Sequence, residues 1–185
     1  MTIRDTFTTI EAFDDFVNRL ENADKLFEFI AGEIVEVPSN ARVSEIAGQI
    51  LFLIKLFLRQ NNLRGHVTGE AGGYQIAGDR YAPDVAYMSV EKQAELEDSG
   101  YNSVPPDLAV EVISSDSPRE KDMLRVKISN YHADGVTVWV VDPETKTVEV
   151  HMPGKRVKIF REKDTVEGGD VLPNLKIPVT EMFDF

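Results

Sequence analysis

The segment Leu108–Ile113, with the sequence Leu-Ala-Val-Glu-Val-Ile, constrains the fold more than any other part of the chain. An apolar run of this length is typical of a β-strand that is covered on both faces. A lone ionised carboxylate in such a strand costs several kcal/mol to bury unless a cation or hydrogen-bond donors meet it. We therefore expect a positively charged group beside Glu111.

A second strand, predicted over residues 81–88, carries Asp84 in a similar setting. Side chains alternate between the two faces of a strand, so Asp84 shares its face with Ala82 and Ala86, as Glu111 does with Ala109. Both carboxylates therefore project from mostly apolar surfaces, and the small alanines leave space beside them.

The cation that Glu111 requires is predicted on the helix that follows. Ser117, Pro118 and Glu120 form an N-terminal signature, with a capping serine, a proline at the first position and a capping glutamate. In a helix running to about Tyr131, Lys127 falls inside an apolar arc of about 140°. We expect its ammonium to meet the strand carboxylates.

One further acid, Glu70, ends a strand predicted over residues 65–70, just before Ala71 and two glycines. Two glutamates, an aspartate and a lysine at strand edges suit a hard divalent cation such as Mg²⁺, which takes one or two carboxylates and keeps several waters. Such an ion activates a bound water and stabilises charge on a phosphate. A lysine nearby can orient or deprotonate the water, or hold the phosphate as a point charge.

The order of elements predicts one mixed α/β domain over residues 1–185, with a central mixed β-sheet flanked by helices. Helices are expected from a capping box at Thr8–Glu11 to about Leu20, over residues 42–60 and over residues 117–131. The charged stretch Ser89–Gly100 is expected to be a surface helix and loop. The remaining strands are predicted over residues 27–30, 33–37, 72–76, 136–142, 148–152 and 157–160.

Composition narrows the function. The chain has no cysteine, which excludes disulfides, thiolate nucleophiles and cysteine-based zinc sites. No apolar leader is visible at Met1 and no apolar stretch is long enough for a bilayer, so a cytoplasmic protein without a membrane partner is expected. The net charge of −12 argues against broad, non-specific adhesion to nucleic acid, although a local basic groove is compatible with it.

Several motifs in this order resemble the Uma2 family of restriction-type endonucleases, within the PD-(D/E)XK nuclease superfamily. The similarity covers roughly residues 9–183 of the chain. The segments that carry it are Gly32–Glu36, Ala82–Ala86, Pro106–Ser114, Lys127 with Tyr131 and Gly135, and Val138–Pro143.

The resemblance implies a restriction-endonuclease-like core and Mg²⁺-dependent cleavage of DNA, with Mn²⁺ able to substitute. It implies that Asp84 and Glu111 bind the metal and that Glu70 is a further acid beside it. The superfamily pattern places a lysine two residues after the glutamate, where this chain has Ile113. The backbone carbonyl of Ile113 is then expected to reach the metal, and Lys127 to supply the amine from the helix.

Basic residues on the Lys127 helix are candidates for contacts with the phosphate backbone. These are Arg119, Lys121 and Arg125. A homodimer is expected as well, because cutting both DNA strands with one site per chain generally needs two chains related by a two-fold axis.

Two other functions stay open. A nuclease-fold module that binds nucleic acid or a protein without cleaving is favoured by Ile113 and by the net charge of −12. A glycosidase carboxylate pair is a weaker alternative, since it leaves the lysine unexplained.

Overall fold

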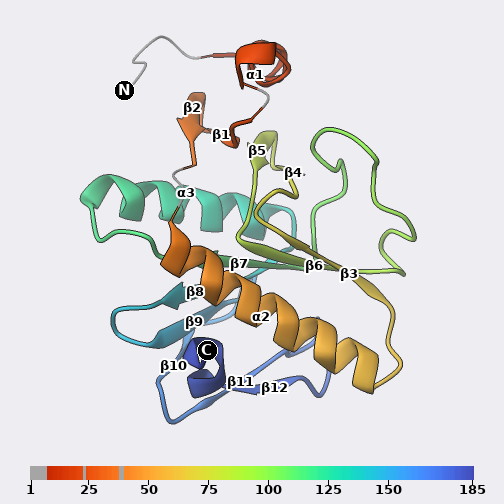
Figure 1. Cartoon of the computed structure of the whole chain (residues 1–185), viewed down its shortest axis with the longest axis vertical. Coiled ribbons are helices and arrows are strands. Elements are labelled where there is room, and N and C mark those ends of the chain that lie inside the picture. Colours follow the sequence, from red (N-terminus) through yellow and green to blue (C-terminus); the bar gives the residue numbers. More distant parts are fainter. Residues whose placement is uncertain (1–7, 23, 38–39) are drawn as a thin grey trace.

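The largest sheet has six strands in the order β10-β9-β8-β7-β6-β3. The computed structural model describes residues 8–22, 24–37 and 40–185 of the chain. The strands β7 and β8 are parallel and the other neighbours are antiparallel, so the predicted mixed sheet is confirmed (Figure 1). Its strands are β3 (Gly65–Gly69), β6 (Val85–Ser89), β7 (Leu108–Val112), β8 (Thr137–Asp142), β9 (Thr147–His151) and β10 (Lys158–Phe160).

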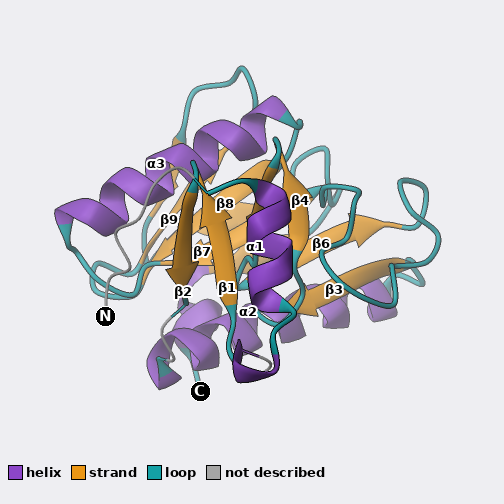
Figure 2. Cartoon of the chain, turned by 90° about the horizontal axis from the view of Figure 1, so that it is seen from above, coloured by secondary structure: helices purple, strands orange, loops and turns teal. Residues whose placement is uncertain are grey.

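Two long helices, α2 (Ala41–Gln60) and α3 (Pro118–Ala133), cover the two faces of this sheet, as Figure 2 shows. The alternation along the strands decides which side chains meet which helix. Val110 and its same-face neighbours pack against α2, while Ala109 and its neighbours pack against α3. Glu111 is two residues after Ala109 on the same strand, so its side chain points to the face that α3 covers.

A second sheet has the strand order β2-β1-β5-β4. Its strands are β1 (Phe27–Ile30), β2 (Glu33–Glu36), β4 (Tyr74–Ile76) and β5 (Asp79–Tyr81). The β1–β2 hairpin turns at Ala31 and Gly32, whose φ angles of 50° and 85° are both positive. Helix α1 (Ile10–Val17) places Phe13 against the aromatic side chains of β1. This sheet packs over α3, so β1 reaches the same face as Glu111.

The C-terminal part adds a hairpin that the sequence prediction lacked, formed by β11 (Thr165–Glu167) and β12 (Lys176–Pro178). Short 3₁₀ helices lie at η1 (Leu20–Asn22) and η2 (Val179–Phe183). Val166, Ile177 and Val179 join the core on the α2 side. No helix within the described ranges is both long and apolar enough to cross a membrane.

Several local predictions were wrong. The strand predicted over residues 81–88 is interrupted at 82–84, because Pro83 has no N–H and the N–H of Ala82 bonds a side chain instead. The N-cap of α1 is Thr9, whose hydroxyl accepts from the N–H of Ala12, and not Thr8. The Gly-Asp pair at residues 78 and 79 predicts the turn between β4 and β5 there, but the turn lies at Ala77–Gly78 and Asp79 already belongs to a strand.

Residues 90–100 form turns and bends, and the helix expected there is absent. The side chain of Asn102 organises this loop by bonding Gln93 and the carbonyl of Val104 and by accepting the N–H of Glu97. Such side-chain bonds to the backbone compete with helical hydrogen bonds. The stretch also offers few apolar side chains with which a helix could dock onto the sheet.

Both ends of α3 follow the sequence prediction. The hydroxyl of Ser117 accepts the N–H of Glu120, with Pro118 as the first helical residue. Gly135, with a φ of 77°, ends the helix in the left-handed conformation that favours glycine. The helix is therefore fixed in length, and Lys127 lies on its buried face.

Candidate active site

Lys127 is the centre of a buried ionic cluster. Its Nζ lies 2.6 Å from Glu111 Oε2 and 2.9 Å from Glu28 Oε1. The three residues come from α3, β7 and β1, and are 7%, 9% and 6% exposed in the order Lys127, Glu111, Glu28. The expectation that a cation lies beside Glu111 is confirmed, and the cation is the predicted one.

Glu28 is a member of this cluster that the sequence reasoning missed. The sequence pattern around it predicts only one strand of a hairpin. Its signal was nevertheless of the same kind as that of Glu111, a single carboxylate between the apolar residues Phe27 and Phe29. Besides Lys127, Glu28 Oε1 accepts the N–H of Ala82 at 2.9 Å. Glu28 therefore joins the small sheet both to α3 and to the segment that carries Asp84.

Asp84 lies directly before β6, at the same end of the β6–β7 strand pair as Glu111. Val85 of β6 pairs with Val110 of β7, and continuing this antiparallel register by one residue places Asp84 opposite Glu111. The N–H of Val112 donates to Asp84 Oδ2 at 2.6 Å. The two carboxylates that the sequence singled out are thus brought together by strand pairing.

Tyr131, one helical turn beyond Lys127, donates its hydroxyl to Glu111 Oε1 at 2.8 Å. Both oxygens of Glu111 therefore have a donor in the protein, one charged and one neutral. The ring of Tyr81 stands edge-on to Tyr131, and Lys127 Nζ lies 5.5 Å from the centroid of the Tyr81 ring. These rings keep the ammonium and the carboxylate in a largely apolar enclosure, which strengthens their attraction.

The electrostatics of the cluster are unbalanced, since three carboxylates face one ammonium. Burial raises the pKa of Asp84 to about 6, against a weaker lowering by the Val112 hydrogen bond and by Lys127. Burial likewise raises the pKa of Glu111, although Lys127 opposes it. Burial alone lowers the pKa of Lys127, but the carboxylates of Glu111 and Glu28 outweigh it and the net shift is upward. Lys127 therefore stays an ammonium at neutral pH.

This excess of negative charge is what a divalent cation would relieve. Asp84 and Glu111 offer two carboxylates at one sheet edge, and oxygen ligands in that number suit Mg²⁺, which fills its other positions with water and substrate oxygens. Among the described residues, no three His, Cys, Asp or Glu side chains form a complete metal-holding group by themselves. The residues present fit a cation that keeps part of its hydration shell.

Glu70 and Ile113, two other predicted site residues, form no hydrogen bond or ion pair with Lys127. Glu70 is exposed in the turn after β3, and its charge contributes to the raised pKa of Asp84. Ile113 follows β7 and donates its N–H to Val141, with its side chain packed on the α3 face. The roles of Glu70 and of the Ile113 carbonyl stay predictions.

The basic residues predicted to contact phosphate lie on the exposed side of α3, each with an acidic partner. Arg119 pairs with Glu33 of β2 at 3.1 Å, Lys121 pairs with Asp116, and Arg125 pairs with Asp122 on its own helix at 2.7 Å. All of them are at least half exposed, so these pairs are weak. Their contact with phosphate stays a prediction.

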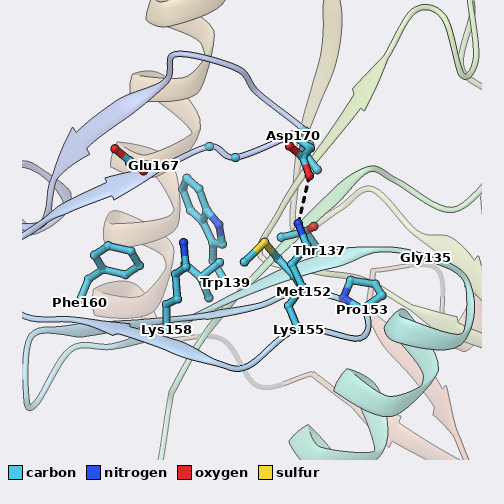
Figure 3. A pocket seen from close by; sticks show the side chains of 14 residues that line it. Gly135, Thr137, Trp139, Met152, Pro153, Lys155, Lys158, Phe160, Glu167 and Asp170 are labelled. Atoms are coloured by element: carbon cyan, nitrogen blue, oxygen red, sulfur yellow. Dashed lines mark hydrogen bonds and ion pairs between the residues drawn. The ribbon is translucent and has the colours of Figure 1, made fainter.

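The structure also contains a hollow of about 290 Å³ beside the N-terminal end of β8, shown in Figure 3. Its wall includes Trp139 and Met152, and the ion pair between Lys155 and Asp170, 3.1 Å long, lies at its rim. No member of the carboxylate cluster lines it, and Trp139 packs on the α2 side of the sheet. The chemistry that the sequence predicts therefore does not belong to this hollow.

Comparison with known proteins identifies the fold and the family. A crystal structure described as a putative nuclease belonging to DUF820 from Anabaena variabilis aligns with a TM-score of 0.75 and 21% identity, covering 92% of this chain and 96% of the other. That likeness shows a shared fold. No curated protein matches the chain. The model of the Uma2 family, described as "Putative restriction endonuclease", matches residues 13–180, and the chain therefore belongs to the Uma2 family.

Proposed function

We propose that this protein is a Mg²⁺-dependent endonuclease that hydrolyses phosphodiester bonds in DNA. The observation that carries the proposal is the buried cluster in which Lys127 meets Glu111 at 2.6 Å while Asp84 faces Glu111 across the β6–β7 pair. A structural ion pair needs one carboxylate for one ammonium. The further acids leave the sheet edge with an affinity for a second cation.

Asp84 and Glu111 would hold that cation, with Glu70 beside it and the carbonyl of Ile113 as a further oxygen. When bound, such an ion supplies an activated water and neutralises charge on the scissile phosphate. Mn²⁺ would substitute for Mg²⁺, because both accept oxygen ligands.

Lys127 acts in this scheme as a fixed positive charge. Its raised pKa keeps it protonated, so it serves to attract and orient a phosphate oxygen rather than to take a proton from water. The two carboxylates and the Tyr81 ring restrict its position, which is the preorganisation that charge stabilisation requires. Arg119, Lys121 and Arg125 would position the DNA by contacts to the phosphate backbone.

The test is cleavage of supercoiled and linear DNA by the purified protein with Mg²⁺ or Mn²⁺, followed on gels. The variants Asp84→Asn, Glu111→Gln and Lys127→Met are expected to lose about a hundredfold or more in rate, and chelation by EDTA is expected to abolish cleavage. Glu167→Gln is the matched control, since it removes an exposed carboxylate on β11 and should cut like the wild type. Equal nicking by wild type and the Asp84 variant would refute the proposal.

A second function, a module that binds nucleic acid or protein without cleaving, is favoured by two observations. Ile113 stands where the superfamily pattern has lysine, and Lys127 is already engaged by Glu28 and Glu111. Calorimetric titration with Mg²⁺ separates the two functions. Absence of any divalent-ion binding, together with retained DNA binding and no cleavage, would identify the binding module.

A further inference from the structure

The outward face of α2 carries a self-complementary set of side chains. Glu45, Gly48, Phe52, Lys55 and Arg59 follow one another at intervals of three and four residues, so they lie on one face of the helix. All five are exposed, whereas the opposite face of α2 is buried against the large sheet. Figure 2 shows α2 on the side of the large sheet opposite α3.

Two of these residues are unusual for a solvated helix surface. Phe52 is 52% exposed, although an aromatic ring gains more than most side chains from burial. Gly48, one turn earlier, lies in the middle of a 20-residue helix, where glycine is unfavourable. A Cβ added at Gly48 would meet no atom within 4 Å, so nothing in its own chain requires glycine there. A glycine at an exposed helix position does leave space for a group from another molecule.

We propose that α2 is the interface of a symmetric homodimer, in which two copies of this helix cross antiparallel about a two-fold axis that passes between Gly48 and Phe52 on the exposed face. In that register, the residue numbers of facing positions sum to 100. Phe52 of each copy then enters the space over Gly48 of the other, since 52 + 48 = 100. A two-fold axis uses each such contact twice.

The charges on the same face fit the same register. Glu45 of one copy faces Lys55 of the other, since 45 + 55 = 100. Neither side chain has an ion pair or hydrogen bond within the described part of its own chain, so both are available. This opposite-sign pairing selects a second copy of the chain over nucleic acid, which Glu45 would repel. The ring of Phe52 at the centre with charges at the rim is the usual anatomy of a protein interface.

A single helix pair buries less surface than a standard interface, so the dimer is expected to be weak and to form in the micromolar concentration range. Sedimentation velocity over a broad range of concentrations measures it. The wild type is expected to shift from monomer to dimer as concentration rises. A chain that stays monomeric at hundreds of micromolar overturns the proposal.

Two substitutions test the contact between Phe52 and Gly48. Phe52→Glu is expected to weaken the dimer at least about tenfold. Gly48→Leu is expected to do the same by filling the space, while it raises the melting temperature of the monomer because leucine is the better helix former. Val157→Glu, at another exposed apolar position, is the control and should leave dimerisation unchanged. Dimerisation that survives both α2 substitutions would assign the interface to another surface.

Charge exchange tests the register itself. Glu45→Lys and Lys55→Glu are each expected to weaken the dimer, because each places like charges opposite one another. The double variant restores opposite charges across the two-fold axis, so its dimerisation is expected to return to near the wild-type level. If the double variant is as weak as the single ones, the antiparallel register is wrong. A cleavage assay is not needed for any of these outcomes, so the proposal stands or fails independently of the proposed nuclease activity.

Discussion

Val112 donates its backbone N–H to the carboxylate of Asp84 at 2.6 Å, and this bond fixes one acid of the cluster to the strand that carries the other. Asp84 lies just before β6, whereas Glu111 is the neighbour of Val112 on β7. Their separation is therefore set by the register of the central sheet rather than by a flexible loop. Sites built on paired strands hold their geometry better than sites built on loops.

Replacing Lys127 by methionine is expected to destabilise the protein strongly at neutral pH. It leaves the buried carboxylates of Glu28 and Glu111 without a cation, and breaking a buried pair in this way costs about 3–5 kcal/mol. At pH 5 the loss should be smaller, because the carboxyl groups can take up protons. Urea unfolding at pH 7.5 and pH 5 measures both values.

Lys121→Met is the matched control for that experiment, because Lys121 lies on the same helix in an exposed pair with Asp116. Its cost should stay within about 1 kcal/mol at either pH. A Lys127 variant whose loss is the same at both pH values would contradict the charge imbalance inferred for the cluster.

The raised pKa of Asp84 predicts how stability depends on pH. Its pKa rises from 3.8 to about 6 in the folded protein, so the folded state holds a proton that the unfolded state has released between these values. The contribution of Asp84 to the free energy of unfolding therefore falls as pH rises through that window, by about 1–3 kcal/mol. Asp84→Asn should flatten this part of the curve, and chemical unfolding at intervals between pH 4 and pH 7 measures it.

Divalent cations should offset the loss of stability that accompanies deprotonation of Asp84. Mg²⁺ or Mn²⁺ competes with the protons on Asp84 and Glu111, so each is expected to raise the melting temperature more at pH 7.5 than at pH 5. The shift should disappear in Asp84→Asn and persist in the remote control Glu167→Gln. An equal shift in wild type and in the Asp84 variant would mean that the ions bind elsewhere.

Much of the site was predictable because a buried charged residue interrupts an apolar pattern in the sequence. Glu111 interrupts an apolar strand, and the helical spacing of Lys127 put it on the buried face of the next helix. Glu28 likewise lies between apolar residues. However, β1 has only four residues and its partner strand β2 is largely exposed, so the hairpin does not indicate a buried face. Only the packing of the small sheet over α3 reveals it.

The local errors have a different origin. The strand-like residues on both sides of Pro83 predict one continuous strand. The N–H of Ala82 instead bonds Glu28, which lies 54 residues earlier in the chain and gives no local signal at Ala82. The loop over residues 90–100 is likewise shaped by Asn102, whose side-chain bonds depend on the tertiary fold. Helices α2 and α3 were predicted within one or two residues because their caps are local.

Tyr131→Phe is expected to change both stability and the pH dependence of cleavage. The substitution removes the hydroxyl that donates to Glu111 Oε1 at 2.8 Å, and leaving a buried carboxylate oxygen without this donor costs about 1–3 kcal/mol. It also disfavours the ionised form, so the pKa of Glu111 rises further and the acid limb of the rate profile should move to higher pH. Tyr101→Phe is the matched control, because it removes a hydroxyl bond of 2.7 Å to the carbonyl of Phe27 and leaves both hydrogen bonds of Glu111 in place. It should lower the unfolding free energy to a similar degree and leave the profile in place. If both variants shift the profile alike, Tyr131 acts on folding alone and not on the charge of Glu111.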